Sequence, residues 1–155
     1  MIADQYPHAI DFAVYAHLQA DDPAAAKALL INRDDHPDVE TAVGSANARV
    51  VVAARVPLDN GDGEASAALC ADMNPANSWE WFPQTVAIRW YAKGIGAARS
   101  GELAATEAAL GQLEKLVEVM TARELRYWLA LLEPLAKPSG DGARCRMVKA
   151  IWRSN

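Results

Sequence analysis

Apolar and polar residues along most of the chain follow the three- and four-residue spacing of amphipathic α-helices. In segment 8–19, for example, Phe12, Tyr15 and Leu18 line one side of the predicted helix. The valine run 50–52 has strand propensity, but the alanines on both sides of it favour a buried helix. The pattern predicts eight helices, over residues 8–19, 23–32, 38 or 41 to about 55, 64–72, 83–98, 102–119, 121–133 and 142–153.

The predicted helices are separated by turn signals that recur at a fixed interval. Asp21, Gly61, Gly101 and Asp141 lie in such breaks, each 40 residues from the next. Gly and Asp tolerate the conformation that ends a helix, and acidic residues in the breaks suit the N-terminus of the next helix. A fixed period in this range is typical of stacked repeats. The sequence therefore predicts an all-α protein, an α-α superhelix of about four antiparallel helix pairs that forms one domain over residues 1–155.

Two local signals predict individual helix ends. Pro57 cannot continue a regular helix, which places the end of the third helix at about Arg55. Thr121 is followed three residues later by Glu124, the spacing of a capping box. That spacing predicts that a helix begins at Thr121.

Composition narrows the class of protein. Of the 155 residues, 52% are hydrophobic and 23% charged, which is typical of a globular chain, and the net charge is −5. An acidic chain lacks the basic face of a nucleic-acid-binding protein, so no nucleic-acid partner is expected. No apolar run approaches a membrane span and the N-terminus has no signal-peptide pattern, so no membrane association and a cytoplasmic location are expected.

The stretch IRWYAKGIGAARSGELAATEAALGQLEKL contains a recognisable pattern. Trp90 and Tyr91 precede a close-packing Gly94, and Leu110 and Leu113 occupy large apolar positions in the second helix. This stretch resembles a tetratricopeptide repeat (TPR) unit. Together with a preceding Phe-Pro and the opening DFAVYAHLQ, it is similar to uncharacterised bacterial, alanine-rich TPR-like proteins. The 40-residue period is longer than the roughly 34 residues of the standard repeat.

The resemblance implies a binding function without catalysis. Stacked helix pairs present a broad face made by the first helix of each pair, which binds proteins or peptides. Apolar residues on that face have two possible roles, in binding or in the core between repeats. The implied binding residues are Asp11, Tyr15, Arg55, Tyr91, Ile95 and Arg99.

A second hypothesis is a small-molecule or metal-binding helical domain. In one form its site lies in the segment Trp79, Glu80, Trp81 and Phe82, where aromatic side chains either anchor a partner or cap the core. In the other form, His36 binds a metal with nearby aspartates, although an acidic loop that caps the next helix explains the same residues. No catalytic or cofactor-binding motif is present, so no enzyme activity, cofactor or bound metal is expected.

The two cysteines and the last predicted helix each allow further predictions. Cys70 and Cys145 are isolated, and they are either buried thiols or a disulfide. The last predicted helix carries an apolar stripe that predicts a homodimer, made of Met147, Val148, Ile151 and Trp152. The chain is alternatively one piece of a longer repeat array.

Overall fold

The computed structural model describes residues 5–32, 43–67 and 82–130. Every regular element in these three ranges is an α-helix. The helices are α1 (Gln5–Gln19), α2 (Pro23–Asn32), α3 (Val43–Asp59), α4 (Gly63–Ala67), α5 (Pro83–Arg99) and α6 (Leu103–Ala122), and residues 126–130 are also helical. The all-α prediction is therefore confirmed for the described residues, including the helical assignment of the valine run 50–52.

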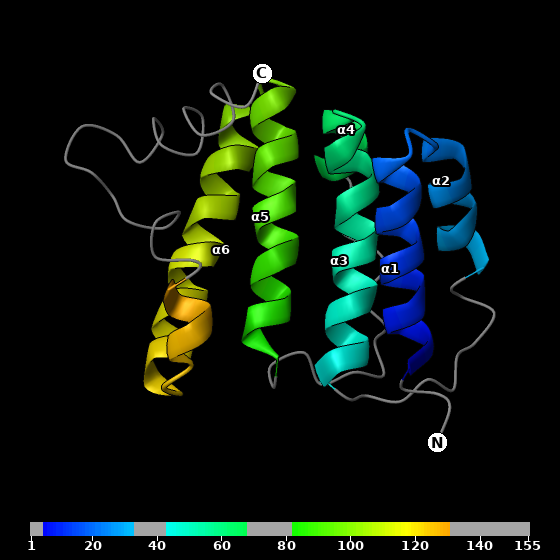
Figure 1. The fold of residues 1–155 in the computed structure, drawn as a ribbon. Coiled ribbons are helices and arrows are strands. Elements are labelled where there is room, and N and C mark those ends of the chain that lie inside the picture. Colours follow the sequence, from blue (N-terminus) through cyan, green and yellow to red (C-terminus); the bar gives the residue numbers. More distant parts are fainter. Residues whose placement is uncertain (1–4, 33–42, 68–81, 131–155) are drawn as a thin grey trace.

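The helices form three antiparallel pairs, α1/α2, α3/α4 and α5/α6, in which the partners pack on each other. We call α1, α3 and α5 the A helices and α2, α4 and α6 the B helices. The A helices run in one direction and the B helices in the other (Figure 1). The helix α3 packs between α1 and α5, so the A helices form one continuous row. Of the predicted fourth pair, residues 126–130 are helical, and the turn at Asp141 and the last helix lie outside the described residues.

The turns inside the three pairs have the same backbone geometry. Asp21, Gly61 and Gly101 have φ values of 58°, 67° and 76°. One residue further on, the N–H donates to a carbonyl five residues back: Asp22 to His17, Asp62 to Pro57, and Glu102 to Ala97. This is the Schellman arrangement, which needs a residue in the left-handed conformation at its centre. Three of the predicted turn positions are thus confirmed as the same structural feature.

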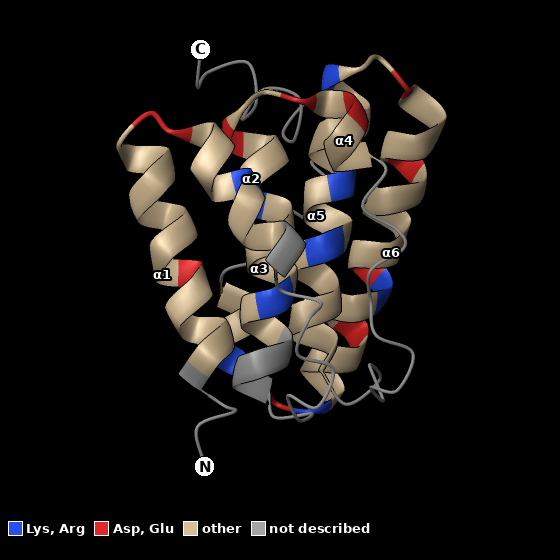
Figure 2. Ribbon diagram, turned by 90° about the vertical axis from the view of Figure 1, so that its right-hand side faces the viewer, with Lys and Arg blue, Asp and Glu red and all other residues tan. Residues whose placement is uncertain are grey.

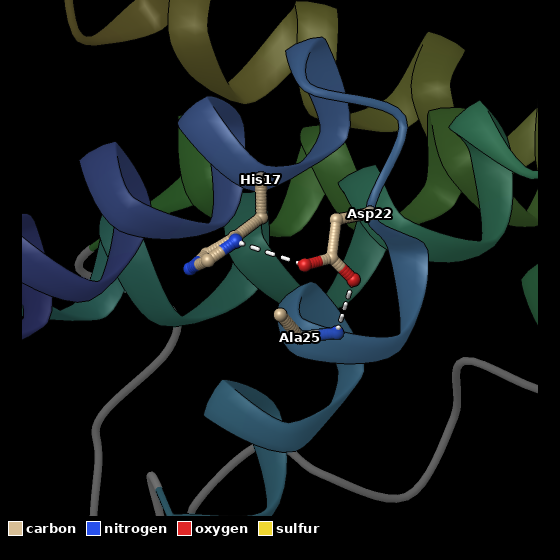
Figure 3. A network of polar contacts seen from close by, with 3 residues as sticks. All are labelled: His17, Asp22 and Ala25. Carbon is tan, nitrogen blue, oxygen red and sulfur yellow. Dashed lines mark hydrogen bonds and ion pairs between the residues drawn. The ribbon is translucent and has the colours of Figure 1, made fainter.

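Two of the three turns also cap the helix that follows. The Asp22 carboxylate accepts a hydrogen bond from the N–H of Ala25 at 3.0 Å, and Asp62 accepts one from Ala65 at 2.8 Å. The other oxygen of Asp22 lies 3.6 Å from Nδ1 of His17, so the carboxylate sits between the end of α1 and the start of α2 (Figure 3). Glu102 makes no such side-chain cap, since Asp but not Glu has the length that N-capping favours.

The turn after α6 follows the same pattern without a glycine. Glu124 has a φ of 55°, and the N–H of Leu125 donates to the carbonyl of Met120 at 3.0 Å. Left-handed conformations cost most non-glycine residues roughly 1–2 kcal/mol. We therefore expect Glu124→Gly to raise the free energy of unfolding by about 0.5–1 kcal/mol and Gly101→Ala to lower it by about 1 kcal/mol.

Urea unfolding followed by circular dichroism measures both changes. Nothing lies within 4 Å of a Cβ added at Gly101, so the loss there reports on the backbone alone. Equal stability of Gly101→Ala and the wild type would contradict the assignment of this turn.

The core has two parts, one on each side of α3. In the first, Val52 and Val56 of α3 pack with residues of α1 and α2, namely Ile10, Val14, Leu18 and Ala26. In the second, Leu110, Leu113 and Met120 of α6 pack with Ala87 and Ile95 of α5. The partly buried residues around it include Leu58, Trp90, Leu116 and Trp128. An A helix that has a helix pair on each side of it, as α3 does, therefore buries two of its own sides.

Equivalent B-helix positions are buried in all three pairs. Ala26 and Ser66 are 0% exposed and Thr106 is 4% exposed, and each is 40 residues from the next. The Thr106 hydroxyl donates to the carbonyl of Glu102, while the Ser66 Oγ has no hydrogen-bond partner. The period thus fixes which residue of each B helix enters the core, even where its side chain is polar.

Two predicted helix ends are wrong. Helix α3 continues through Pro57 to Asp59, because a proline in the last turn removes only one hydrogen bond of the helix. Thr121 does not begin a helix, since α6 runs on to Ala122 and the Thr121 hydroxyl donates back to the carbonyl of Val117 at 2.7 Å. The left-handed Glu124 is part of the turn that follows α6, so the two residues form no capping box.

Candidate functional site

The structure brings three of the predicted binding residues together across α1 and α3. Asp11 and Tyr15 lie one helical turn apart on α1, and Arg55 of α3 lies beside both. The Arg55 Nη2 is 3.1 Å from Oδ1 of Asp11, and its Cζ is 5.2 Å from the centre of the Tyr15 ring. We call Asp11, Tyr15 and Arg55 the α1–α3 cluster.

The α1–α3 cluster is partly exposed. The exposed fraction of the side chain is 30% for Arg55 and 23% for Asp11, and Tyr15 is 48% exposed as a residue. Pairs with this much solvent contact contribute less than about 1 kcal/mol to folding. The cluster therefore does little for stability, but it holds an aromatic ring and a guanidinium in fixed positions at the surface.

The other predicted residues on the A helices have different roles. Ile95 is 7% exposed and packs in the core, the second of the two roles that its sequence position allowed. The exposed Arg99 donates from Nη1 to the carbonyl of Leu58 at 2.9 Å. Arg55 and Arg99 thus each reach from one A helix to the preceding one, a bridging role that the sequence did not predict.

Tyr91 is half-buried, and burial raises the pKa of its phenol above the ordinary value of 10.0, while Arg99 opposes the shift. A raised pKa in the folded state means that folding favours the neutral phenol. The resulting stabilisation is fully present below pH 10 and is lost as the pH rises through the folded-state pKa. Tyr91 is therefore uncharged at physiological pH.

A second cation–aromatic group on α5 was not predicted as a site. The Nζ of Lys93 lies 4.9 Å from the centre of the Trp90 ring, and Cζ of Arg89 lies 5.7 Å from it. The sequence signal was the three-residue spacing of Trp90 and Lys93, which places this cation next to the ring on a helix. The spacing of Arg89, directly before Trp90, gives no such signal. Trp90 itself was identified only as the aromatic residue of the repeat.

Charge is distributed unevenly along the molecule. The turns α1–α2, α3–α4 and α5–α6 lie at one end and are acidic, whereas most of the blue segments lie along the helices (Figure 2). The acidic turn residues Asp22, Asp62 and Glu102 directly precede the B helices, where negative charge is favourable. Helix α1 is tan except for one acidic turn (Figure 2).

The remaining predicted residues lie outside the described ranges. These are Trp79, Glu80 and Trp81 of the aromatic segment, His36 of the possible metal site, both cysteines, and the last predicted helix. Within residues 5–32, 43–67 and 82–130, no group of three or more His, Cys, Asp or Glu side chains could hold a metal ion. None of the helices described in these ranges is long and apolar enough to cross a membrane.

Comparison with known proteins adds no relative. No protein-family model, curated protein or solved structure matches the chain significantly. The resemblance to TPR proteins thus stays a prediction, and the function is argued from the structure of the chain itself.

Proposed function

We propose that the chain is a non-enzymatic helical-repeat protein. It binds a protein or peptide through the side of its A helices that carries the α1–α3 cluster. In this proposal the helix pairs stack as in TPR-like superhelices, and the α1–α3 cluster forms part of the binding surface. The observation that carries the proposal is the Asp11–Arg55–Tyr15 group, whose members come from two helices and are held at the surface.

The chemistry of the cluster suits a peptide ligand. The ring of Tyr15 offers a rigid aromatic surface, and Tyr and Arg are enriched among the residues that dominate binding energy at interfaces. A guanidinium has five N–H donors, and the Asp11 carboxylate does not use all of them. Arg55 is therefore able to donate to a peptide carbonyl or carboxylate while it stays in place on Asp11.

Position in the repeat also supports the proposal. Residues 15, 55 and 95 are 40 residues apart, as are residues 11, 51 and 91. They therefore occupy equivalent places on successive A helices and lie on one side of the row. Because Ile95 is buried, the side chains that reach the surface at positions 15, 55 and 95 are those of Tyr15 on α1 and Arg55 on α3.

The test is a selection of binders from a random-peptide display library on the full chain. We expect Tyr15→Ala and Arg55→Ala to weaken the selected peptides at least about tenfold each, because aromatic and arginine anchors dominate such interfaces. Tyr127→Ala is the matched control, since Tyr127 is 70% exposed and lies far along the chain from the cluster. The proposal would be refuted if the selection gave no binders. It would also be refuted if the selected peptides bound both cluster variants as tightly as the wild type.

A thermal-shift screen with divalent metals and metabolites separates this function from the small-molecule alternative. The proposal expects no compound to raise the melting temperature. A compound that stabilises the protein without competing with the selected peptides would favour the small-molecule or metal site.

A further inference from the structure

The first A helix has an apolar side that nothing in the described structure covers. Ala9, Phe12, Ala13 and Ala16 are spaced three and four residues apart and line one side of α1. Phe12 is 72% exposed, the highest value among the large hydrophobic residues in the described ranges. Ala9 and Ala16 are also exposed. We call these four residues the end face.

The repeat shows what normally covers this side of an A helix. Residues 40 positions after Phe12 and Ala16 are Val52 and Val56 of α3, which are 1% and 4% exposed. They are buried by α1 and α2, the preceding helix pair. The end face is the same side of α1, and no helix pair of the described residues lies against it.

The corresponding side of α5 is also covered by the helix pair that precedes it. Ala92 is 1% exposed, and a Cβ at Gly96 would come within 2.5–2.6 Å of Gly63, Ser66 and Ala67 in α4. Ala92 and Gly96 stand 40 residues after Val52 and Val56. The covering surface is therefore a helix pair of this same chain in both described cases.

We propose that the end face binds the end face of a second copy of this chain, forming a two-fold symmetric dimer. Phe12 is the middle residue of α1 (Gln5–Gln19), so a two-fold axis near it aligns the two helices along their whole length. A self-complementary surface must carry both knobs and holes. Phe12 is the knob, and the small side chains of Ala9, Ala13 and Ala16 leave the space that receives it.

Charge also favours a second copy over another partner. A two-fold contact brings identical side chains together, so like charges on the surface would repel. Among Asp, Glu, Lys and Arg, α1 contains only Asp11, and Arg55 forms an ion pair with it. Helix α1 is almost free of charged residues in Figure 2, unlike α3, α5 and α6. This inference does not rest on the proposed peptide binding, because the end face does not include Asp11, Tyr15 or Arg55, the residues of the α1–α3 cluster.

Sedimentation velocity on the full chain, across the low- to high-micromolar range, tests the dimer. One helix pair provides an interface at the small end of specific contacts, so we expect a dissociation constant in the micromolar range. Phe12→Glu is expected to weaken the dimer roughly thirty-fold or more, because it places a charge at the centre of the contact. Leu103→Glu is the matched control and should leave the dimer unchanged, since Leu103 is 68% exposed at the start of α6.

Circular dichroism tests whether each variant stays folded. If Phe12→Glu does not fold, Ala16→Glu is the second variant. A wild type that sediments as a monomer throughout, or a dimer that persists in both variants, would overturn the inference. Oligomers larger than a dimer that become more abundant at higher concentration would also overturn it. A two-fold contact stops at the dimer, whereas head-to-tail contacts form open chains of molecules. Arg55→Ala, in the part of the α1–α3 cluster that lies on α3, should dimerise normally, which separates this test from that of the peptide site.

Discussion

Replacing Gly96 with alanine is expected to destabilise the protein by about 2 kcal/mol, because a side chain there overpacks the contact between α4 and α5. A Cβ at Gly96 would come 2.5 Å from the backbone N of Ala67 and 2.6 Å from the backbone O of Gly63. Both neighbours are backbone atoms, which cannot move aside as a flexible side chain can. One of the two helices must shift, and its core contacts weaken with it.

The same substitution at Gly111 is the matched control and should have the opposite sign. Gly111 lies inside α6, and nothing is within 4 Å of a Cβ placed on it. Alanine is a better helix former than glycine by roughly 1 kcal/mol, so Gly111→Ala is expected to raise the free energy of unfolding by about 0.5–1 kcal/mol. At Gly96 the same gain in helix propensity is present, but the steric cost exceeds it.

Urea unfolding of the two variants and the wild type measures both effects under one set of conditions. The decisive quantity is the difference between the two variants, because it cancels the general preference for alanine in helices. If both substitutions stabilised the protein, the close approach of α4 and α5 at Gly96 would be wrong.

Leu113→Ala is expected to cost about 2–5 kcal/mol, the usual range for removing a fully buried leucine side chain. Leu113 is 1% exposed and belongs to the core between α5 and α6, together with Leu110 and Met120. The lost atoms leave a cavity between two packed helices, and such a site relaxes only partly. A loss of this size is a large part of the stability of a typical domain.

Leu103→Ala controls for the loss of leucine as a residue type. Leu103 begins α6 and is 68% exposed, so its replacement should change the free energy of unfolding by no more than about 0.5 kcal/mol. A small effect of Leu113→Ala in the same denaturation experiment would show that α6 does not pack on α5 as described.

Several features of the fold were predictable because they are encoded over short stretches of chain. Gly61 and Gly101 mark turns because only glycine adopts a left-handed backbone without cost, and both do so here. Asp21 occupies the same place in the first turn, and Asp22 beside it caps α2. Helix α2 begins and ends at the predicted residues, Pro23 and Asn32.

Local signals failed where two of them competed. The sequence pattern of Thr121 and Glu124 satisfies a capping box, but it also allows a longer α6 that ends in a left-handed residue. Burial of Met120, which is 0% exposed, favours the longer helix because it brings that side chain into the core. Pro57 is likewise kept in α3, where it is buried and its carbonyl accepts the hydrogen bond from Asp62 that closes the turn.

The sequence by itself determined the helices and the 40-residue period, since hydrophobic spacing and turn residues act within one or two helical turns. Only the tertiary structure decided the role of each residue on a helix. Phe12, Val52 and Ala92 occupy equivalent positions, yet Phe12 is 72% exposed and the other two are 1% exposed. The physical reason is that burial depends on whether another helix pair lies alongside, a property of the neighbours rather than of the residue. The same reason explains why Ile95 is in the core while Arg55 bridges two helices at the surface.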